Sequence, residues 1–321
     1  MNYLKFIPQY GLFVLLLSLF SFTLLKDRNT TLEIVTKHDT SLYSAHLHRN
    51  IVLDILLPPD YNYSNKSYKV LYMNDGQDLQ RLQMTKLLTQ LFENAQLPPF
   101  VLVAIHCGDR MQEYGTAAQA DYKQRGAKAT AYTAFITEEL MPHIEKKYPV
   151  LMGASNTVFC GFSLGGLSAF DIVWHYPHLF GKVGVFSGSF WWRQRAYEDH
   201  YDDENDRIMH RLVRQSAGGS GQSSIDTSYS ELITRNSPLG THHSELNFWF
   251  QTGTEDEKDD RNNNGVIDSI EDTLDLIAEL EKKGYRWGKE IRYVEVENGQ
   301  HDPTTWSSVM PDFLTWAFGT K

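Results

Sequence analysis

Apolar residues recur along the chain in short runs, and each run ends in residues that favour turns. The runs are rich in isoleucine, valine and leucine, a composition that favours β-strands. Eight such runs predict eight strands. They are TLEIVTKHD (31–39), RNIVLDILLPP (49–59), KVLYMNDG (69–76), FVLVAIHCG (100–108), TVFCGFS (157–163), KVGVFSGS (182–189), LNFWFQTG (246–253) and IRYVEVENG (291–299).

Helical patterns lie between several of these runs, as at residues 130–148 and 272–285. Near-continuous apolar strands that alternate with amphipathic helices indicate a parallel sheet covered on both faces. The predicted fold class is therefore α/β, with a mostly parallel central sheet and helices on both faces. In such sheets functional sites lie outside the carboxyl ends of the strands, and the motifs of this chain fall at those ends.

Residues 193–245 interrupt the alternation. The charged segment RQRAYEDHYDDENDRIMHRLVRQ comes first, and the glycine- and serine-rich SAGGSGQSS follows it. We expect an insertion over the sheet that is helical at first and flexible afterwards. A lid over a pocket and a solvated surface excursion explain this pattern equally well. The predicted domain spans residues 30–321 and contains this lid-like insertion.

The first 25 residues differ from the rest of the chain. Lys5 precedes the uncharged run FIPQYGLFVLLLSLFSFTLL, which ends before Lys26. A basic start followed by an apolar stretch is typical of an export signal, and twenty helical residues also span a bilayer core of roughly 30 Å. Residues 1–25 are therefore predicted to be a signal peptide or an N-terminal membrane anchor. Either one exports the remainder, which would be periplasmic, secreted or membrane-anchored.

Composition narrows the classes of function. The chain has 321 residues, of which 13% are aromatic and 22% charged, as in a globular protein. Its formal net charge of −10 and the absence of a basic stripe argue against a nucleic-acid partner, because phosphate binding needs clustered lysine and arginine. The two cysteines, Cys107 and Cys160, are too few for a disulfide framework. Each ends an apolar run, where a small buried side chain is expected.

The segment VFCGFSLGGLSAF contains the pattern Gly161-x-Ser163-x-Gly165, which is weak evidence by itself. A nucleophile elbow also requires a strand before the serine and a helix after it. Here the strand TVFC precedes the turn, and LSAFDIVWHYP continues with helical spacing until Pro177. Ser163 is therefore predicted to be a nucleophile. The backbone N–H of Leu164, at the helix N-terminus, is predicted to stabilise an oxyanion.

A serine hydroxyl is a poor nucleophile until a base removes its proton. In this type of fold the triad follows the chain order serine, acid, histidine. Among twelve histidines, His301 is the one that follows the acidic cluster beginning at Glu255. It also lies on a loop that leaves the last predicted strand. A lone loop histidine is usually a surface residue, but position and order together favour His301 as the base.

The orienting acid should lie at the end of the preceding strand, where TEDEKDD offers several carboxylates. Asp256 falls on the first turn after Gly253 and is our choice, with Glu255 and Glu257 as alternatives. Such a carboxylate fixes the imidazole tautomer and stabilises the imidazolium that forms.

A second oxyanion donor is expected from the loop after the third strand, MNDGQDL. Gly76 allows a tight turn there, which leaves the N–H of Gln77 as the predicted donor. Asp75 and Asp78 in the same loop are interpreted as structural turn residues.

A second motif, DRNNNGVIDSIE at residues 260–271, matches the EF-hand loop pattern at every specified position. No helix precedes it, so it predicts half of an EF-hand with a structural Ca²⁺ ion. The alternative is a polar loop whose aspartate and asparagine residues cap one another. No cofactor is expected in catalysis. The predicted ligands are the side chains of Asp260, Asn262, Asn264, Asp268 and Glu271 and the backbone carbonyl of Val266.

Five motifs, YMNDGQ, GDRMQEYG, GFSLGG, FSGSFWW and NGQHDPTTW, occur in this order. Together they resemble the putative-esterase family of α/β hydrolases, which includes enterochelin-esterase-like enzymes, feruloyl and acetyl-xylan esterases, esterase D and the mycolyltransferases. The resemblance covers roughly residues 45–318. It implies an α/β-hydrolase fold, a triad and an oxyanion hole. The residues it implies are Ser163, Asp256 and His301 for the triad and the amides of Leu164 and Gln77 for the oxyanion hole.

The resemblance also implies a sheet order in which the strand ending at MNDG separates the strands ending at Cys107 and Cys160. Strands lie about 4.8 Å apart, so those thiols would be too distant for a disulfide. Arg110, Trp191 and Trp192 lie near strand ends and are candidates to line the substrate pocket. Packing under the lid explains the tryptophans equally well.

These features predict a serine carboxylic-ester hydrolase. An acyltransferase of the same fold shares every motif, and a non-catalytic binding module that keeps the fold is the third hypothesis. The expected partner is a small-molecule, carbohydrate or siderophore ester, because the aromatic residues suit aryl esters, sugar esters and siderophores equally.

Overall fold

The computed structural model describes residues 33–62, 64–216 and 246–319. Its centre is an eight-stranded sheet with the order β1-β4-β6-β5-β7-β8-β9-β10. All eight strands predicted from the sequence are present, and β2 (Tyr43–Ser44) and β3 (Arg49–Asn50) form a separate small hairpin. The sheet strands are β1 (Val35–Asp39), β4 (Leu53–Leu57), β5 (Lys69–Asn74), β6 (Phe100–Ile105), β7 (Thr157–Phe162), β8 (Lys182–Phe186), β9 (Asn247–Glu255) and β10 (Ile291–Gln300).

The sheet is mostly parallel, as predicted. The six strands from β5 to β10 run in one direction, and β4 and β1 are added antiparallel to β6 and to β4. Strand β5 lies between β6 and β7, as the resemblance implied. Cys107 and Cys160 are both free, in agreement with that order.

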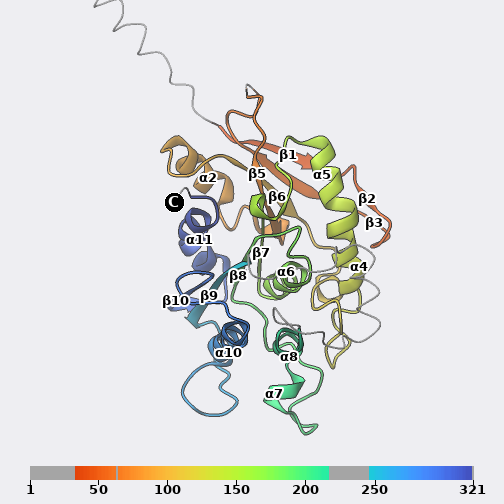
Figure 1. The fold of residues 1–321 in the computed structure, drawn as a ribbon, viewed down its shortest axis with the longest axis vertical. Coiled ribbons are helices and arrows are strands. Elements are labelled where there is room, and N and C mark those ends of the chain that lie inside the picture. Colours follow the sequence, from red (N-terminus) through yellow and green to blue (C-terminus); the bar gives the residue numbers. More distant parts are fainter. Residues whose placement is uncertain (1–32, 63, 217–245, 320–321) are drawn as a thin grey trace, which may run out of the picture. The chain divides into compact units, whose positions relative to one another are not determined.

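Helices cover both faces of the sheet (Figure 1). One face packs on α2 (Met84–Glu93) and α11 (Pro303–Phe318), neither of which the sequence patterns identified. Asp302 begins α11 because its carboxylate accepts the N–H of Thr305, and Pro303 follows at the first helical position. The other face packs on α4 (Ala129–Ala134), η2 (Phe135–Leu140), α5 (Met141–Lys147), α6 (Leu164–His175), α8 (Ile208–Gln215) and α10 (Asp268–Lys282).

Side chains of the central strands alternate between these two layers. In β5, Leu71 and Met73 face α2 and α11, whereas Val70 and Tyr72 face the opposite helices. All four are buried. Such a strand is apolar throughout because both of its faces lie in a core, which explains the near-continuous apolar runs in the sequence.

Short helical turns complete the described chain. They are η1 (Gly76–Asp78), α3 (Arg110–Glu113), η3 (Ala154–Asn156) and α7 (Asp203–Asp206). The insertion predicted at residues 193–245 begins with non-helical residues and then forms α7 and α8, and residues 217–245 lie outside the described part. Arg207, between α7 and α8, is buried and pairs with Asp272 and Asp275 of α10. These ion pairs hold the first part of the insertion against the sheet's helical layer.

Among the described helices, none has both the length and the apolarity that crossing a membrane would require. The apolar run predicted to be a signal or an anchor, within residues 1–25, lies outside the described residues.

Candidate active site

Five polar residues follow directly after the ends of five neighbouring parallel strands. Asp75 follows β5, Ser163 follows β7, Ser187 follows β8, Asp256 follows β9 and His301 follows β10. Parallel neighbours end at the same edge of a sheet, so these residues share one edge. The structure therefore brings all three predicted triad residues to the rim where the sequence placed them.

Ser163 occupies a sharp turn between β7 and α6. Its backbone has φ 54° and ψ −122°, a conformation that non-glycine residues rarely adopt. The turn is possible because glycines flank the serine: a Cβ atom on Gly161 would lie 2.2 Å from the carbonyl oxygen of Gly165, and one on Gly165 would lie 2.6 Å from a carboxylate oxygen of Asp75. Both glycines are required by close approach, as expected of a nucleophile elbow.

The Ser163 hydroxyl bonds to another serine in this structure. Its Oγ lies 3.2 Å from the Oγ of Ser189, and the N–H of Ser189 donates to the carbonyl oxygen of Ser163 at 3.2 Å. No hydrogen bond joins Ser163 to His301 in the described part of the chain. Ser189 is a residue that the sequence analysis did not single out, although it lies in the FSGSFWW motif.

His301 combines an exposed position with a perturbed imidazole. Neighbouring protein atoms displace enough water to lower the pKa of His301, and the positive charge of Arg110 acts in the same direction. The negative charge of Asp256 acts to raise it. The imidazole also meets the Trp306 ring edge-on, with ring centroids 5.4 Å apart. A histidine that is neutral and near a carboxylate has the state that a general base needs.

Two carboxylates act on the pKa of His301, and Asp256 has a larger effect than Asp302. Burial raises the pKa of Asp256, whereas the Gly253 backbone, the Ser187 side chain and His301 act to lower it. The alternatives fit less well: Glu255 is exposed, and the pKa of Glu257 is shifted by burial and by residues of α10 and the loop before it, not by His301. Both carboxylate oxygens of Asp256 are buried without a hydrogen-bond partner in the described structure.

Two backbone N–H groups are free for an oxyanion. Leu164 is the first residue of α6, so its N–H has no partner within the helix. Neither this N–H nor that of Gln77 donates a backbone hydrogen bond among the described residues. The turn before Gln77 places Asp75 at φ 60°, and Gly76 packs so closely on β6 that a Cβ would lie 2.8 Å from the backbone of Ala104.

Cys107 adjoins this second donor. The side-chain amide of Gln77 donates to its sulfur at 3.3 Å. Burial raises the pKa of the Cys107 thiol to about 11, which keeps it protonated near neutral pH. The thiol is therefore a poor nucleophile, in agreement with the sequence interpretation.

The three residues predicted to line a substrate pocket occupy different surroundings. Arg110 lies beside the elbow: its guanidinium donates to Asp75 and also to the carbonyl oxygen of Phe162 at 3.1 Å. Trp192 is fully buried, so its surroundings support the packing alternative. Trp191 is half-buried, and the guanidinium of Arg125 stacks on it at 4.8 Å.

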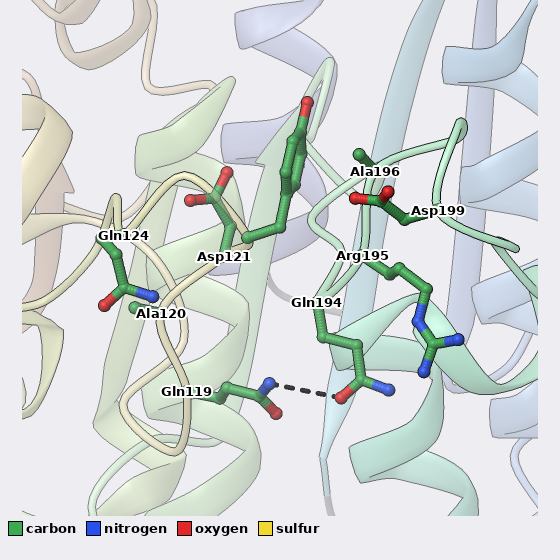
Figure 2. Close-up of a pocket in the computed structure, with 9 residues that line it drawn as sticks. Gln119, Ala120, Asp121, Gln124, Gln194, Arg195, Ala196 and Asp199 are labelled. Carbon is green, nitrogen blue, oxygen red and sulfur yellow. Dashed lines mark hydrogen bonds between the residues drawn. The ribbon is translucent and has the colours of Figure 1, made fainter.

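A cavity of about 500 Å³ lies between the loop after α3 and the start of the insertion (Figure 2). Its polar groups bond largely to one another and to neighbours: Gln119 donates to Gln194 at 3.2 Å, and Gln194 donates to Asp206 at 2.8 Å. None of the predicted catalytic residues lines it. Its walls are Gln119, Ala120, Asp121, Tyr122, Gln124, Gln194, Arg195, Ala196 and Asp199.

The predicted calcium loop has several of its candidate ligands close together. The side-chain amides of Asn262 and Asn264 lie 2.8 and 2.6 Å from Glu271, and Asp260 accepts the N–H groups of Asn264 and Gly265. Gly265, at φ 87°, makes the turn that the pattern predicts. In the described residues no group of three or more histidine, cysteine, aspartate or glutamate side chains is arranged to hold a metal. Asn262 and Asn264, two of the predicted ligands, are amides and do not belong to these four residue types.

Arg261, the second residue of this loop, was not anticipated from the sequence. Its guanidinium contacts Asp268 at 3.2 Å and Glu271 at 3.3 Å, two of the predicted ligands. It also pairs with Asp203 of α7 at 2.9 Å. The loop is therefore tied to the insertion through Arg261.

Comparison with known proteins gives both a family and a fold. A family model described as putative esterase matches residues 44–317. The uncharacterized protein YbbA of Bacillus subtilis (strain 168) is 32% identical over 161 residues, which are 49% of this chain and 64% of YbbA. The enterobactin esterase of Shigella flexneri, solved in the presence of enterobactin, has a TM-score of 0.63 and 20% identity over 89% of this chain and 59% of that one. The ferulic acid esterase of Anaeromyces mucronatus has a TM-score of 0.57 and 19% identity over 92% and 94%.

The chain thus spans less than two thirds of the length of YbbA and of the Shigella enzyme. It spans nearly the whole of the fungal enzyme. These structural likenesses confirm the predicted α/β-hydrolase fold.

Proposed function

The chain belongs to the putative esterase family, and from that premise we propose that it is a serine carboxylic-ester hydrolase with Ser163, Asp256 and His301 as its triad. The observation that carries this proposal is the backbone of Ser163, which holds a serine at φ 54° at the end of a central parallel strand. Strain of this kind persists where the surroundings enforce it, and it exposes the serine hydroxyl above the sheet.

The proposed reaction has two steps. The Ser163 hydroxyl turns from Ser189 toward His301, which takes its proton while Oγ attacks the ester carbonyl carbon. The N–H groups of Leu164 and Gln77 stabilise the oxyanion, and the leaving alcohol takes the proton from His301. A water molecule then gives a proton to His301 while its oxygen attacks the acyl carbon. His301 returns that proton to Oγ of Ser163 as the bond between Oγ and the acyl carbon breaks, which releases the carboxylic acid and regenerates the Ser163 hydroxyl.

Labelling with a fluorophosphonate probe tests the nucleophile directly. We expect the wild-type chain to be labelled and Ser163→Ala to remain unlabelled. His301→Ala should be labelled at least about a hundredfold more slowly, because general-base catalysis contributes that much or more. Equal labelling of the wild type and Ser163→Ala would show that Ser163 is not the nucleophile.

The substrate proposal is an ester of a small aromatic or siderophore-like acid. It rests on the structural neighbours, which include an enterobactin esterase and a ferulic acid esterase. A panel of enterobactin, a feruloyl ester, an acetyl ester and a thioester separates these classes by kcat/KM. Added glycerol distinguishes hydrolysis from acyl transfer, because a transferase would yield the glycerol ester as its main product.

We further propose that residues 260–271 bind a structural Ca²⁺ ion, with the predicted ligand set Asp260, Asn262, Asn264, Val266, Asp268 and Glu271. The match to the loop pattern supports this, as does the convergence of its first, third, fifth and twelfth residues. The ion would stabilise the segment between Asp256 and α10 and take no part in the chemistry.

Export is proposed on the sequence of residues 1–25. In this proposal residues 30–321 form the esterase domain, and residues 193–245 form its lid-like insertion. N-terminal sequencing of the mature protein from the expressing cell tests export. A cleaved chain in the medium or periplasm supports a signal peptide, and an intact chain in the membrane fraction supports an anchor. An intact chain in the soluble cytoplasm would contradict both.

A further inference from the structure

Trp306, near the start of α11, contacts three residues that belong to the proposed triad or lie beside it: Phe162, His301 and Ser187. Its indole stacks on Phe162, the residue before Ser163, with ring centroids 5.0 Å apart. The same ring meets the imidazole of His301 edge-on at 5.4 Å. Its Nε1 donates a buried hydrogen bond of 2.9 Å to the hydroxyl of Ser187.

Ser187 is the next member of this set of contacts. It is buried, directly follows β8 and has a backbone φ of 46°. Because its oxygen accepts the indole proton, its own proton is left to donate elsewhere. Asp256 follows β9, the parallel neighbour of β8, so the two side chains lie at the same edge of the sheet, and the Ser187 side chain is among the groups that act to lower the pKa of Asp256.

The carboxylate of Asp256 lacks the hydrogen-bond donor that Ser187 can supply. Both of its carboxylate oxygens are buried and have no hydrogen-bond partner in the described structure. A buried carboxylate without donors is costly, and small rotations that supply them are favourable. Three groups adjoin it: the Gly253 backbone, which is fixed in β9, and two side chains that can rotate toward its oxygens, the hydroxyl of Ser187 and the imidazole of His301.

On the basis of the proposed triad, we propose that Trp306 and Ser187 are positioning residues for its acid and base. The indole N–H fixes the Ser187 hydroxyl so that its proton is directed at one oxygen of Asp256, and the other oxygen is left for the imidazole of His301. The T-shaped contact with the same indole limits the rotation of the imidazole. The order of donation is Trp306 to Ser187 to Asp256, and no covalent step is involved.

A purely structural role for the Trp306 hydrogen bond is the competing explanation. The chain tolerates a buried indole whose N–H has no partner, since Nε1 of Trp249 in β9 is buried and unpaired among the described groups. Trp249→Phe is therefore a matched control: it removes the same atoms from a buried site without removing a hydrogen bond. The comparison isolates the donor function of Trp306.

The test measures the rate constant of fluorophosphonate labelling as a function of pH for Trp306→Phe, Ser187→Ala, the double variant and Trp249→Phe. Labelling should slow about tenfold in each single variant, because each one removes the oriented hydrogen bond from Ser187 to the charged Asp256. The double variant should be no slower than Ser187→Ala, because the two residues act in series. Loss of the oriented carboxylate should also move the acid limb of the profile to lower pH, since Asp256 and Asp302 act to raise the pKa of His301 and only Arg110 and burial would then oppose Asp302.

Melting temperatures, measured alongside, ensure that all rates refer to folded protein, and Ser187→Ala carries the test by itself if Trp306→Phe does not fold. Labelling rates and a pH profile like those of Trp249→Phe in either folded variant would overturn the inference. Failure of the proposed function has a different signature, since Ser163→Ala would then be labelled like the wild type.

Discussion

Arg110 and Asp75 form a bidentate ion pair beside the proposed nucleophile. Nε of the arginine lies 2.9 Å from one carboxylate oxygen and a terminal nitrogen lies 3.0 Å from the other. Asp75 is 2% exposed, and the arginine provides the paired hydrogen bonds that a buried carboxylate requires. The same guanidinium donates to the carbonyl oxygen of Phe162, and its positive charge acts to lower the pKa of His301. The pair therefore links the loop after β5 to the elbow and to the base.

Replacing Arg110 with methionine should change the pH dependence of the reaction. The positive charge of Arg110 acts to lower the pKa of His301, so its removal should raise that pKa. Because the base works only when unprotonated, the acid limb of the labelling or hydrolysis profile should move to higher pH. Lys128→Met, which removes an exposed cation that does not perturb His301, is the control. An unmoved limb, or one displaced to lower pH, would contradict the assignment of His301 as the base.

Gly161→Ala should disable the elbow. The new methyl group would lie 2.2 Å from the carbonyl oxygen of Gly165, so the backbone must move. We expect a loss of about 1–3 kcal/mol in the free energy of unfolding and a large fall in fluorophosphonate labelling. Gly166→Ala is the matched comparison, because its nearest contacts are 3.0 Å away and alanine favours the helix. Denaturant unfolding and labelling of the two variants check this, and equal behaviour of both would count against the strained turn.

The sequence predicted the sheet well because each central strand carries its own apolar run. It did not predict α2 and α11. In α11 two prolines, Pro303 and Pro311, obscure the helical pattern, although the first is well placed at a helix start. A sequence pattern shows only the local spacing of apolar residues. It does not show which face of the sheet a helix will cover.

The candidate site shows the same division. Ser163 and His301 were assigned from motif and chain order, which a sequence contains. The bond from Trp306 to Ser187 joins residues 119 positions apart, and the pair between Arg261 and Asp203 joins residues 58 apart. Such contacts depend on the register of strands and on how the insertion packs, so no spacing rule could have indicated them.

The depressed pKa of Asp39 should make the free energy of unfolding depend on pH. Burial acts to raise its pKa, but hydrogen bonds from Lys147, Ser41 and His143 outweigh burial and hold the pKa of Asp39 well below its ordinary value. A depressed folded pKa stabilises the protein above the unfolded value of about 3.9, and this stabilisation is lost as pH falls below it. Asp39→Asn should therefore cost about 1–2 kcal/mol at pH 7, a modest value because Lys147 is partly exposed.

Urea denaturation of wild type and Asp39→Asn at several pH values measures this difference. It should shrink steadily between about pH 4 and the acid end of the range, because the wild-type carboxylate is then protonated as well. Asp60→Asn is a suitable control, since Asp60 pairs with the exposed Lys66 at 3.5 Å. A difference that is constant with pH would mean that the charge of Asp39 is not the source of its effect.

The calcium proposal makes a prediction that separates metal binding from a self-capped loop. Glu271 is the last ligand of the pattern, and in this structure it accepts from Asn262 and Asn264 and contacts Arg261. If Ca²⁺ binds, the ion replaces these donors as the partner of the carboxylate, and the melting temperature should rise with Ca²⁺ concentration. A ligand present at a hundred times its Kd stabilises the folded state by about 2.7 kcal/mol.

Glu271→Gln should abolish that rise because it removes the bidentate carboxylate, while Glu281→Gln makes the same change at an exposed position of α10 and should preserve it. Calorimetric titration with CaCl₂ measures the binding itself, and MgCl₂ should substitute poorly, since Mg²⁺ demands a tighter octahedral site.

Because the loop adjoins Asp256 in sequence, removing Ca²⁺ with a chelator should lower the labelling rate of the wild type more than that of Glu271→Gln. Equal responses of the wild type and Glu271→Gln would leave the self-capped loop as the correct description.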